Sequence, residues 1–211
     1  MVDSFGKLIS FEGGEGTGKS TQIKLLEKSL KLAGFKVLIL REPGSSAVSE
    51  DIRKILLSEK NSEISHMAEL LLYEAARAQL CDEVIRPALE AGLVVLCDRF
   101  YDSTTAYQGY GRGLDIDEIK RLNLLATGGL VPDFTFVLDI DPKIGLARAR
   151  NTGTPDRLES EKLQFHQKVR KGFLAIAKEE PQRVHVISAT HEPQFIADHI
   201  RELLKLARLF D

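Results

Sequence analysis

Residues 13–20 read Gly-Gly-Glu-Gly-Thr-Gly-Lys-Ser and fit the pattern G-x-x-x-x-G-K-S. Glycines let successive backbone N–H groups turn inward around phosphates, Lys19 adds a positive charge near the β- and γ-phosphates, and the Ser20 hydroxyl can bind Mg²⁺. An apolar run precedes the pattern at residues 8–11, and a helical pattern follows at residues 21–33. This is the strand-then-helix context that the motif requires, so the segment predicts a binding site for ATP or GTP.

Charged residues follow other apolar runs, where ligands bind in parallel α/β sheets. Asp98 follows four apolar residues, an arrangement by which P-loop enzymes hold Mg²⁺, usually through water. A helix cap or an ion pair with Arg99 is the alternative role for Asp98. The same predicted crevice is surrounded by Arg41, Arg53 and Arg99. A guanidinium group can bind two phosphate oxygens at once through two parallel hydrogen bonds. A second phosphate-bearing ligand is therefore expected.

Short apolar runs alternate with segments of helical periodicity along the chain, and two of the runs are continuous enough for strands covered on both faces. This pattern predicts a three-layer α/β/α P-loop NTPase fold with a five-stranded parallel sheet. We expect one domain over residues 1–211, with a short flexible lid at about 148–158, where Gly and Pro separate two helical patterns. The expected strands are residues 7–11, 36–40, 93–97, 134–139 and 183–187.

Composition narrows the class of partner. The chain has 211 residues, 43% of them hydrophobic, and a formal net charge of -2, which argues against a nucleic-acid-binding protein. Residues 1–7 lack the features of a signal peptide, and no apolar run reaches about 18 residues, so we expect no membrane partner and a cytoplasmic location. Cys81 and Cys97 have no C-x-x-C spacing and are expected to fill core volume, and the scattered histidines do not indicate a zinc site.

Several segments together carry a family resemblance. Residues 98–109 read Asp-Arg-Phe-Tyr-Asp-Ser-Thr-Thr-Ala-Tyr-Gln-Gly, residues 41–44 read Arg-Glu-Pro-Gly, and residues 11–16 read Phe-Glu-Gly-Gly-Glu-Gly. In this order they resemble thymidylate kinases of the bacterial type, and the resemblance extends over essentially the whole chain. It implies transfer of the γ-phosphoryl group of ATP to dTMP, with Mg²⁺ as cofactor, in a homodimer.

The resemblance also implies how the acceptor is recognised. Tyr73 and Arg77 are four residues apart and share a face of the predicted helix. By the family pattern, Tyr73 stacks on thymine, Arg77 donates to its O4 carbonyl, and Thr104 bonds at the N3 side. Gln108 supports the base or sugar, and Tyr107 crowds the sugar 2′ position and thereby favours deoxyribose.

The remaining implied roles concern phosphates and chemistry. Glu15 matches an acidic position that contacts the 3′-hydroxyl of dTMP, and no general base is needed because the attacking phosphate is already ionised. The catalytic residues implied are Lys19, Arg99, Arg150, Arg157 and Glu15, and Ser20 and Asp98 are the metal ligands. The donor nucleotide is assigned to Gly13, Gly14, Glu15, Gly16, Thr17, Gly18, Lys19, Ser20, Thr21 and Arg148. The acceptor is assigned to Glu15, Arg41, Pro43, Arg53, Tyr73, Arg77, Arg99, Ser103, Thr104, Tyr107 and Gln108.

The chain departs from the family pattern in the lid and in one loop. Gly16 and Thr152 stand where relatives often carry arginine, which leaves open whether Arg148, Arg150 or Arg157 stabilises the transition state. Ser45-Ser46 replaces the usual Gly-Thr. Residues 187–190 follow the last expected strand, where related kinases approach the adenine ring.

Two other functions stay open on the sequence. One is a P-loop kinase with a different small acceptor, such as a deoxynucleoside or another nucleoside monophosphate. The other is a regulatory nucleotide switch, which the absence of an [NT]-K-x-D motif, and of a D-x-x-G motif after a strand, disfavours. The apolar residues 67–72 fit either a dimer face or the core.

Overall fold

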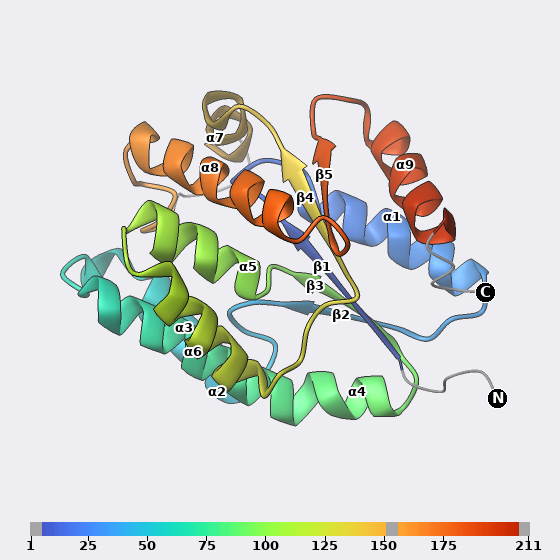
Figure 1. Cartoon of the computed structure of the whole chain (residues 1–211), viewed down its shortest axis with the longest axis horizontal. Helices are drawn as coiled ribbons and strands as arrows, with labels where there is room; N and C mark the ends of the chain where they lie inside the picture. The colour runs from blue at the N-terminus through green and yellow to red at the C-terminus, as the bar shows by residue number, and fades with distance from the viewer. Residues whose placement is uncertain (1–5, 151–155, 207–211) are drawn as a thin grey trace.

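The computed structural model describes residues 6–150 and 156–206 and shows a central sheet between two layers of helices (Figure 1). All of its strand pairs are parallel, in the order β2-β3-β1-β4-β5. The predicted fold is confirmed, and each predicted strand agrees with an observed one to within one residue at either end. The strands are β1 (Lys7–Glu12), β2 (Val37–Arg41), β3 (Val94–Asp98), β4 (Phe134–Asp139) and β5 (Val184–Ser188).

One face of the sheet is covered by α1 (Lys19–Leu32) and α9 (Pro193–Leu206). Strand residues alternate between the two faces, so Ile9 and Phe11 pack beneath these helices while Leu8 points to the other side. No helix within the described residues is long and apolar enough to cross a membrane.

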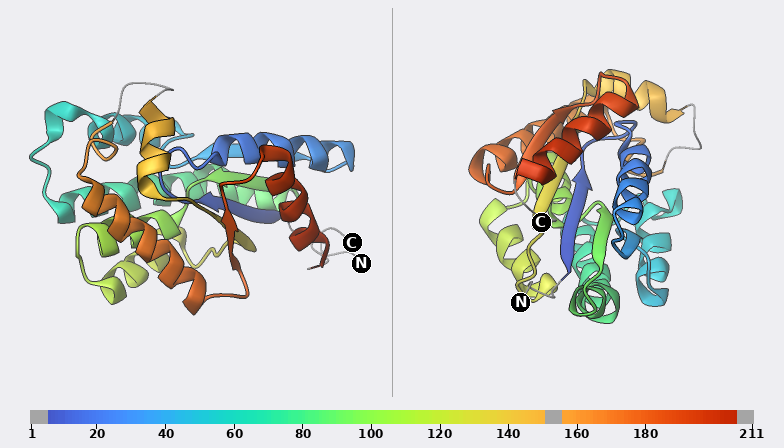
Figure 2. Two further views of the ribbon diagram at one scale, coloured as in Figure 1. Left: turned by 90° about the horizontal axis from the view of Figure 1, so that it is seen from above. Right: turned by 90° about the vertical axis from the view of Figure 1, so that its right-hand side faces the viewer.

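The opposite face carries a longer series of helices, seen from two further sides in Figure 2. Cys81 and Cys97 lie buried in the core on this face, as expected. The elements packed here are α3 (His66–Leu80), the π-helical segment η2 (Cys81–Ile85), α4 (Arg86–Glu90), α5 (Tyr101–Thr104), the π-helical segment η3 (Thr105–Gly111) and α8 (Leu163–Glu179). The remaining helices are α2 (Ala47–Leu57), the 3₁₀ turn η1 (Glu59–Asn61), α6 (Ile116–Thr127) and α7 (Pro142–Arg150).

Capping residues explain where several helices begin. Ser46, Ser65 and Asp115 accept hydrogen bonds from the backbone N–H three residues later, at the starts of α2, α3 and α6. Ser46 is one of the two residues that depart from the family pattern, and it keeps a side-chain hydroxyl that can cap the helix, as the usual threonine would.

The strand register brings the polar ends of the strands to one edge. Asp98 at the end of β3 pairs with Phe11 in β1 and with Arg41 in β2, and Glu12 ends β1 beside Val137. Because the strands are parallel, the loops that follow these residues share one rim of the sheet.

The loop of residues 13–18 packs directly against α7. A Cβ atom added at Gly16, whose φ is 63°, would meet the Gly145 carbonyl oxygen at 2.1 Å. A Cβ atom on Gly145 would in turn lie 2.3 Å from the Glu15 carbonyl oxygen. Two glycines therefore permit the close approach between this loop and α7.

This approach gives a test of the fold. Gly145→Ala forces α7 away from the loop, and we expect it to lower the free energy of unfolding by about 1–3 kcal/mol in thermal or urea denaturation. Gly14→Ala is the matched control, because a Cβ atom there meets nothing within 4 Å. Equal stability of the two variants would contradict the tight packing.

Candidate functional site

The loop between β1 and α1 forms the first part of the site. Lys19 is 8% exposed, and its ammonium donates to the carbonyl oxygens of Gly13 at 3.3 Å and Gly14 at 2.9 Å, which places the charge across the loop. Burial and the nearby Arg99 lower the Lys19 pKa, against the opposing effect of Glu15 and Asp98. A phosphate binding at this loop would meet a fixed cation together with the N-terminus of α1.

The two predicted metal ligands lie side by side. Ser20 Oγ donates to Asp98 Oδ2 at 2.9 Å. Hydroxyl and carboxylate oxygens suit Mg²⁺, which binds through few protein ligands and keeps several waters or phosphate oxygens. Within the described residues, no group of three or more His, Cys, Asp or Glu side chains could hold a metal. The donor set thus fits Mg²⁺ held partly by phosphate and water.

Arg99 links this loop to a neighbouring cavity. Its backbone φ of 71° lies in the left-handed region, which is rare for a residue with a side chain and costs about 1–3 kcal/mol. The guanidinium donates to the Gly13 carbonyl at 2.9 Å, to Ser103 Oγ at 3.1 Å and to Glu15 Oε1 at 2.8 Å. The left-handed backbone at Arg99 therefore lets its guanidinium contact both the phosphate loop and the cavity wall.

Glu15 and Tyr107 complete this link. The Tyr107 hydroxyl donates to Glu15 Oε1 at 2.6 Å, and the Arg99 guanidinium lies over the Tyr107 ring at 5.0 Å from its centroid. Burial raises the pKa of Glu15, but the charges of Arg99 and Lys19 outweigh it and lower the pKa to about 2. Glu15 is consequently ionised near neutral pH.

Glu12 secures the turn from beneath. This fully buried carboxyl at the end of β1 accepts from Phe100 N at 2.7 Å and from Ser103 Oγ at 2.5 Å. Burial, followed by repulsion from Asp102, raises the pKa of Glu12 from 4.5 to about 8. The backbone on the C-terminal side of Arg99 is thus tied to the central strand.

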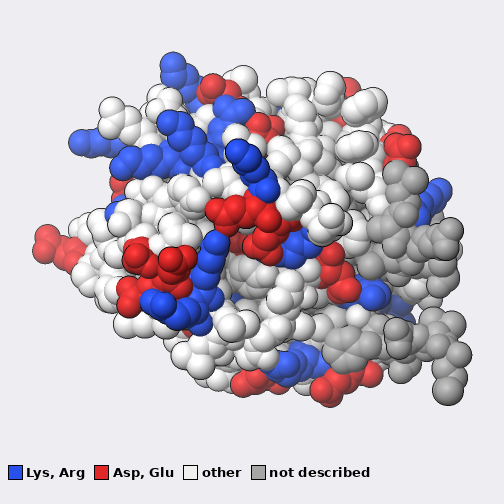
Figure 3. All heavy atoms as spheres, in the orientation of Figure 1, with Lys and Arg blue, Asp and Glu red and all other residues white. Residues whose placement is uncertain are grey.

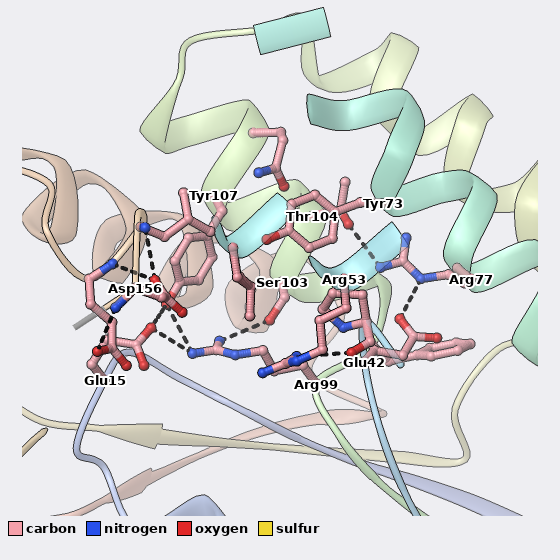
Figure 4. A pocket seen from close by; sticks show the side chains of 16 residues that line it. Glu15, Glu42, Arg53, Tyr73, Arg77, Arg99, Ser103, Thr104, Tyr107 and Asp156 are labelled. Atoms are coloured by element: carbon pink, nitrogen blue, oxygen red, sulfur yellow. Dashed lines mark hydrogen bonds and ion pairs between the residues drawn. The ribbon is translucent and has the colours of Figure 1, made fainter. Parts of the chain in front are cut away.

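The cavity beside Arg99 encloses about 660 Å³ of space free of protein atoms, including its open mouth. In Figure 4, Glu15 and Asp156 lie towards one end and Arg77 lies at the other. Of the predicted acceptor residues, all but Arg41 line it. The lining residues are Glu15, Glu42, Pro43, Arg53, Leu57, Tyr73, Arg77, Arg99, Phe100, Ser103, Thr104, Tyr107, Gln108, Asp156, Leu158 and Glu159.

Arg77 is held rigidly at the far end of the cavity. It is 2% exposed, and Nε donates to Glu42 at 2.8 Å while Nη1 donates to Glu74 at 2.9 Å and to Asn123 at 3.3 Å. Nη2 donates to Thr104 Oγ1 at 2.9 Å. A guanidinium has five N–H groups, so one hydrogen on Nη2 is left over from these bonds. An N–H donor therefore stands next to a hydroxyl acceptor on the cavity wall.

Tyr73 and Arg53 form other parts of the wall. Burial raises the pKa of Tyr73, so its hydroxyl stays protonated. Arg53 Nη1 donates to the Pro43 carbonyl at 2.9 Å, which fixes the guanidinium beside the cavity.

Two predicted arginines lie elsewhere. Arg41 makes an ion pair with Glu50 at 2.8 Å and does not line the cavity. Arg157 pairs with Glu69 at 2.6 Å, its Nε donates to the Leu56 carbonyl at 3.0 Å, and it does not line the cavity. The roles of both arginines stay predictions.

The donor side is described in part. Arg148 Nη1 donates to the Ala189 carbonyl at 3.1 Å, which joins α7 to the segment expected near adenine. Arg150 ends α7 and is exposed. Thr152, where the chain departs from its relatives, lies outside the described residues.

Sequence reasoning missed several residues of the site. Glu12 and Glu42 each end or follow an apolar run, and such a buried acid could have been suspected from its position between a strand and a Gly- or Pro-containing loop. Leu57, Phe100, Asp156, Leu158 and Glu159 line the cavity without any motif that assigns them there.

The parallel sheet, the phosphate loop and the adjoining polar cavity define a P-loop nucleotide-binding α/β protein with room for a second ligand. A family model described as thymidylate kinase matches residues 11–200. Thymidylate kinases from Gloeobacter violaceus and Synechococcus sp. (strain JA-2-3B'a(2-13)) are similar, at 52% and 53% identity. The alignments cover 92% of this chain and 92% of the first relative, and 90% and 89% for the second.

A solved structure supports the same grouping. The crystal structure of thymidylate kinase from Ehrlichia chaffeensis is similar with a TM-score of 0.79 and 35% identity, over 95% of this chain and 99% of that chain. This chain belongs to the thymidylate kinase family.

The raised pKa of Glu12 gives a prediction about stability. Its folded-state pKa of about 8 lies above the ordinary 4.5, so the folded protein binds the proton more tightly, and this stabilisation is lost as pH rises from about 5 through 8. Glu12→Gln mimics the protonated acid. The slope of its unfolding free energy with pH should be less negative than that of the parent by about 1.4 kcal/mol per pH unit in this range.

The measurement is chemical denaturation at intervals between pH 5 and 9. Glu179→Gln, at an exposed ion pair on α8, is the matched control and should keep the parent slope. Parallel curves for Glu12→Gln and the parent would refute the burial of an acid with a raised pKa.

Proposed function

We propose that this chain transfers the γ-phosphoryl group of ATP to dTMP, with ATP at the phosphate loop and dTMP in the cavity beside Arg99. Membership of the thymidylate kinase family supports the reaction. The placing of the two nucleotides rests on the geometry of the loop and the cavity.

The observation that carries the assignment is the pairing of Arg77 with Thr104. The remaining N–H of Arg77 Nη2 is available to a ligand, and Thr104 Oγ1 accepts at 2.9 Å from the same nitrogen with a second lone pair to spare. Thymine offers an O4 acceptor beside an N3–H donor, which complements this order. Cytosine offers a donor at N4, which would face the Arg77 N–H donor and leave both buried donors unpaired.

The other end of the cavity suits the sugar and phosphate. The Tyr107 ring is 4% exposed and held by Glu15 and Arg99, so a 2′-hydroxyl placed against it would meet a ring that cannot move aside. Arg53 and Arg99 supply guanidinium groups for the acceptor phosphate, and Glu15 faces the sugar. Arg41 stays a candidate for the phosphate only if it leaves Glu50.

Chemistry then depends on alignment and charge. The acceptor phosphate is ionised at neutral pH and needs no base, so the chain acts by holding both phosphates in line and covering the charge of the transferred group. Lys19 and Arg99 provide fixed positive charge for it. Ser20 and Asp98 would hold Mg²⁺, which when bound neutralises charge on the β- and γ-phosphates.

Base binding is tested at Thr104. Thr104→Val removes the hydroxyl at nearly constant volume, and we expect kcat/KM for dTMP to fall by about 10- to 100-fold, because one buried hydrogen bond to the base is lost. Thr104→Ser keeps the hydroxyl and should retain the parent kcat/KM. An unchanged kcat/KM in Thr104→Val would remove the base from this end of the cavity.

The metal assignment is tested separately. Asp98→Asn weakens the carboxylate that accepts from Ser20, and the free Mg²⁺ concentration giving half-maximal rate should rise by about 10-fold or more. Isothermal titration of the protein with dTMP alone serves as the second readout and should be unaffected. If Asp98→Asn needs no more Mg²⁺ than the parent, Asp98 is not a metal ligand and serves only as the hydrogen-bond partner of Ser20.

We also propose a homodimer through α2 and α3. These helices pack together, and their apolar side chains Val48, Ile55, Met67 and Leu71 are 49%, 45%, 40% and 49% exposed. Met67 and Leu71 are four residues apart and so share one helix face. The apolar residues 67–72 therefore serve both locations: Met67 and Leu71 lie on the surface, whereas Leu70 is 1% exposed and belongs to the core.

Leu71→Arg should convert the dimer to a monomer in light scattering with size exclusion, because a buried unpaired charge is incompatible with an apolar interface. Leu124→Arg is the control on α6, where the side chain is 60% exposed. A parent that elutes as a monomer, or a dimer that survives Leu71→Arg, rejects this interface.

The single-domain organisation, the lid at 148–158 and the cytoplasmic location stay predictions. Acidic side chains stand among the basic ones on the face of the molecule shown in Figure 3. Several basic side chains gather at the upper left of this view.

A further inference from the structure

Glu69 joins three parts of the chain through one buried carboxylate. It lies in the first turn of α3 and is 0% exposed. Oε1 accepts from Gln108 Nε2 at 2.8 Å and from Arg112 Nε at 3.1 Å. Oε2 accepts from Arg112 Nη2 at 3.2 Å and pairs with Arg157 Nη2 at 2.6 Å. The helix that carries Tyr73 and Arg77 is thereby connected to η3 and to the chain after residue 155.

A second acid, Glu161, balances the positive charges around Glu69. Arg112 also pairs with Glu161 at 2.5 Å, so two guanidinium groups meet two carboxylates. Burial raises the pKa of Glu69, but hydrogen bonds from Arg112 and Gln108 outweigh it and lower the pKa. An ionised, buried carboxylate is costly unless every partner is in place, so removing its charge should displace the groups that it holds.

The groups held by Glu69 include part of the acceptor cavity. Arg157 does not line the cavity, but Asp156 and Leu158 on either side of it do, as does Glu159. Asp156 Oδ1 accepts from Leu158 N at 2.8 Å and from Glu159 N at 2.9 Å, which makes this a compact turn. The turn is anchored at Arg157 by Glu69 and the Leu56 carbonyl, and near its end by the pair of Glu161 with Arg112.

Glu69 also decides which way the Gln108 amide points. A carboxylate accepts only, so the Nε2 group of Gln108 must face it, and the amide oxygen is left as an acceptor. Gln108 lines the cavity on the same side as Tyr107 and Thr104. One carboxylate thus fixes both a wall side chain and the turn of residues 156–161.

We propose that Glu69 is a positioning residue for the acceptor nucleotide, which acts through Arg157 and Gln108 to hold the turn of residues 156–161 and one wall of the cavity in place. This inference rests on the proposed binding of dTMP in that cavity. It assigns Arg157 an anchoring role in place of direct contact with the transferred phosphoryl group.

The first test is Glu69→Gln, which keeps the size of the side chain and removes its charge. We expect the KM for dTMP to rise about 10-fold, with kcat and the KM for ATP within about twofold of the parent. Glu179→Gln is the control for the substitution itself. Arg183→Met, which breaks the buried pair with Asp102, is the control for lost stability and should lower the melting temperature without a selective change in the KM for dTMP.

Arg157→Gln carries the same test if Glu69→Gln does not fold. If Arg157 anchors the turn, Arg157→Gln should raise the KM for dTMP and leave kcat nearly unchanged. If Arg157 instead contacts the transferred phosphoryl group, the same substitution should lower kcat by about 10³-fold or more. The double variant should be no worse than the poorer single variant, because both changes break one connection.

Three results would overturn the proposal: a parent-like KM for dTMP in Glu69→Gln, equal changes in the KM for dTMP and ATP, or a collapse of kcat in Arg157→Gln. The proposed acceptor site fails independently, since an unchanged kcat/KM for dTMP in Thr104→Val removes dTMP from the cavity whatever Glu69 does.

Discussion

The site depends on one guanidinium group at the rim of the sheet. Arg99 reaches the phosphate loop through the Gly13 carbonyl and the cavity through Glu15 and Tyr107. It can do so only because its backbone lies in the left-handed region, a strained conformation that needs support. Glu12 gives that support by accepting from the next backbone N–H. Donor loop and acceptor cavity are therefore parts of one hydrogen-bonded unit.

A common arrangement recurs around this unit, in which buried carboxylates fix two guanidinium groups of the cavity region. Glu42 and Glu74 hold Arg77, and Glu69 holds Arg157. A long side chain loses rotamer entropy when it is immobilised, so ordering it before the ligand arrives lowers the cost of binding. Rigid positioning matters here because phosphoryl transfer relies on alignment more than on acid or base groups.

Much of the fold was predictable because its signals are local, whereas the residues of the cavity wall were assigned from the family resemblance. Glycine spacing in residues 13–20 and the continuous apolar runs define the loop and the strands, and the four-residue spacing of Tyr73 and Arg77 places both on one helix face. The contacts of Arg157 could not be predicted because a guanidinium on a long side chain has many orientations. Its partner Glu69 lies on another helix, and no local pattern connects the two. Glu12 was assigned no role, since burial of an acid depends on the elements packed around it.

The balance of charge near the loop shows why an acid can stand beside two sets of phosphates. Glu15 is a carboxylate where the two proposed phosphates would meet, and the positive charges of Arg99 and Lys19 lower its pKa. Its Oε1 oxygen is already engaged by Arg99 and Tyr107. The acid therefore repels phosphate weakly and orients the two groups beside it, and the same ion pair that screens Glu15 keeps Tyr107 against the place proposed for the sugar. Screening of the acid and exclusion of a 2′-hydroxyl are in this way two consequences of one contact.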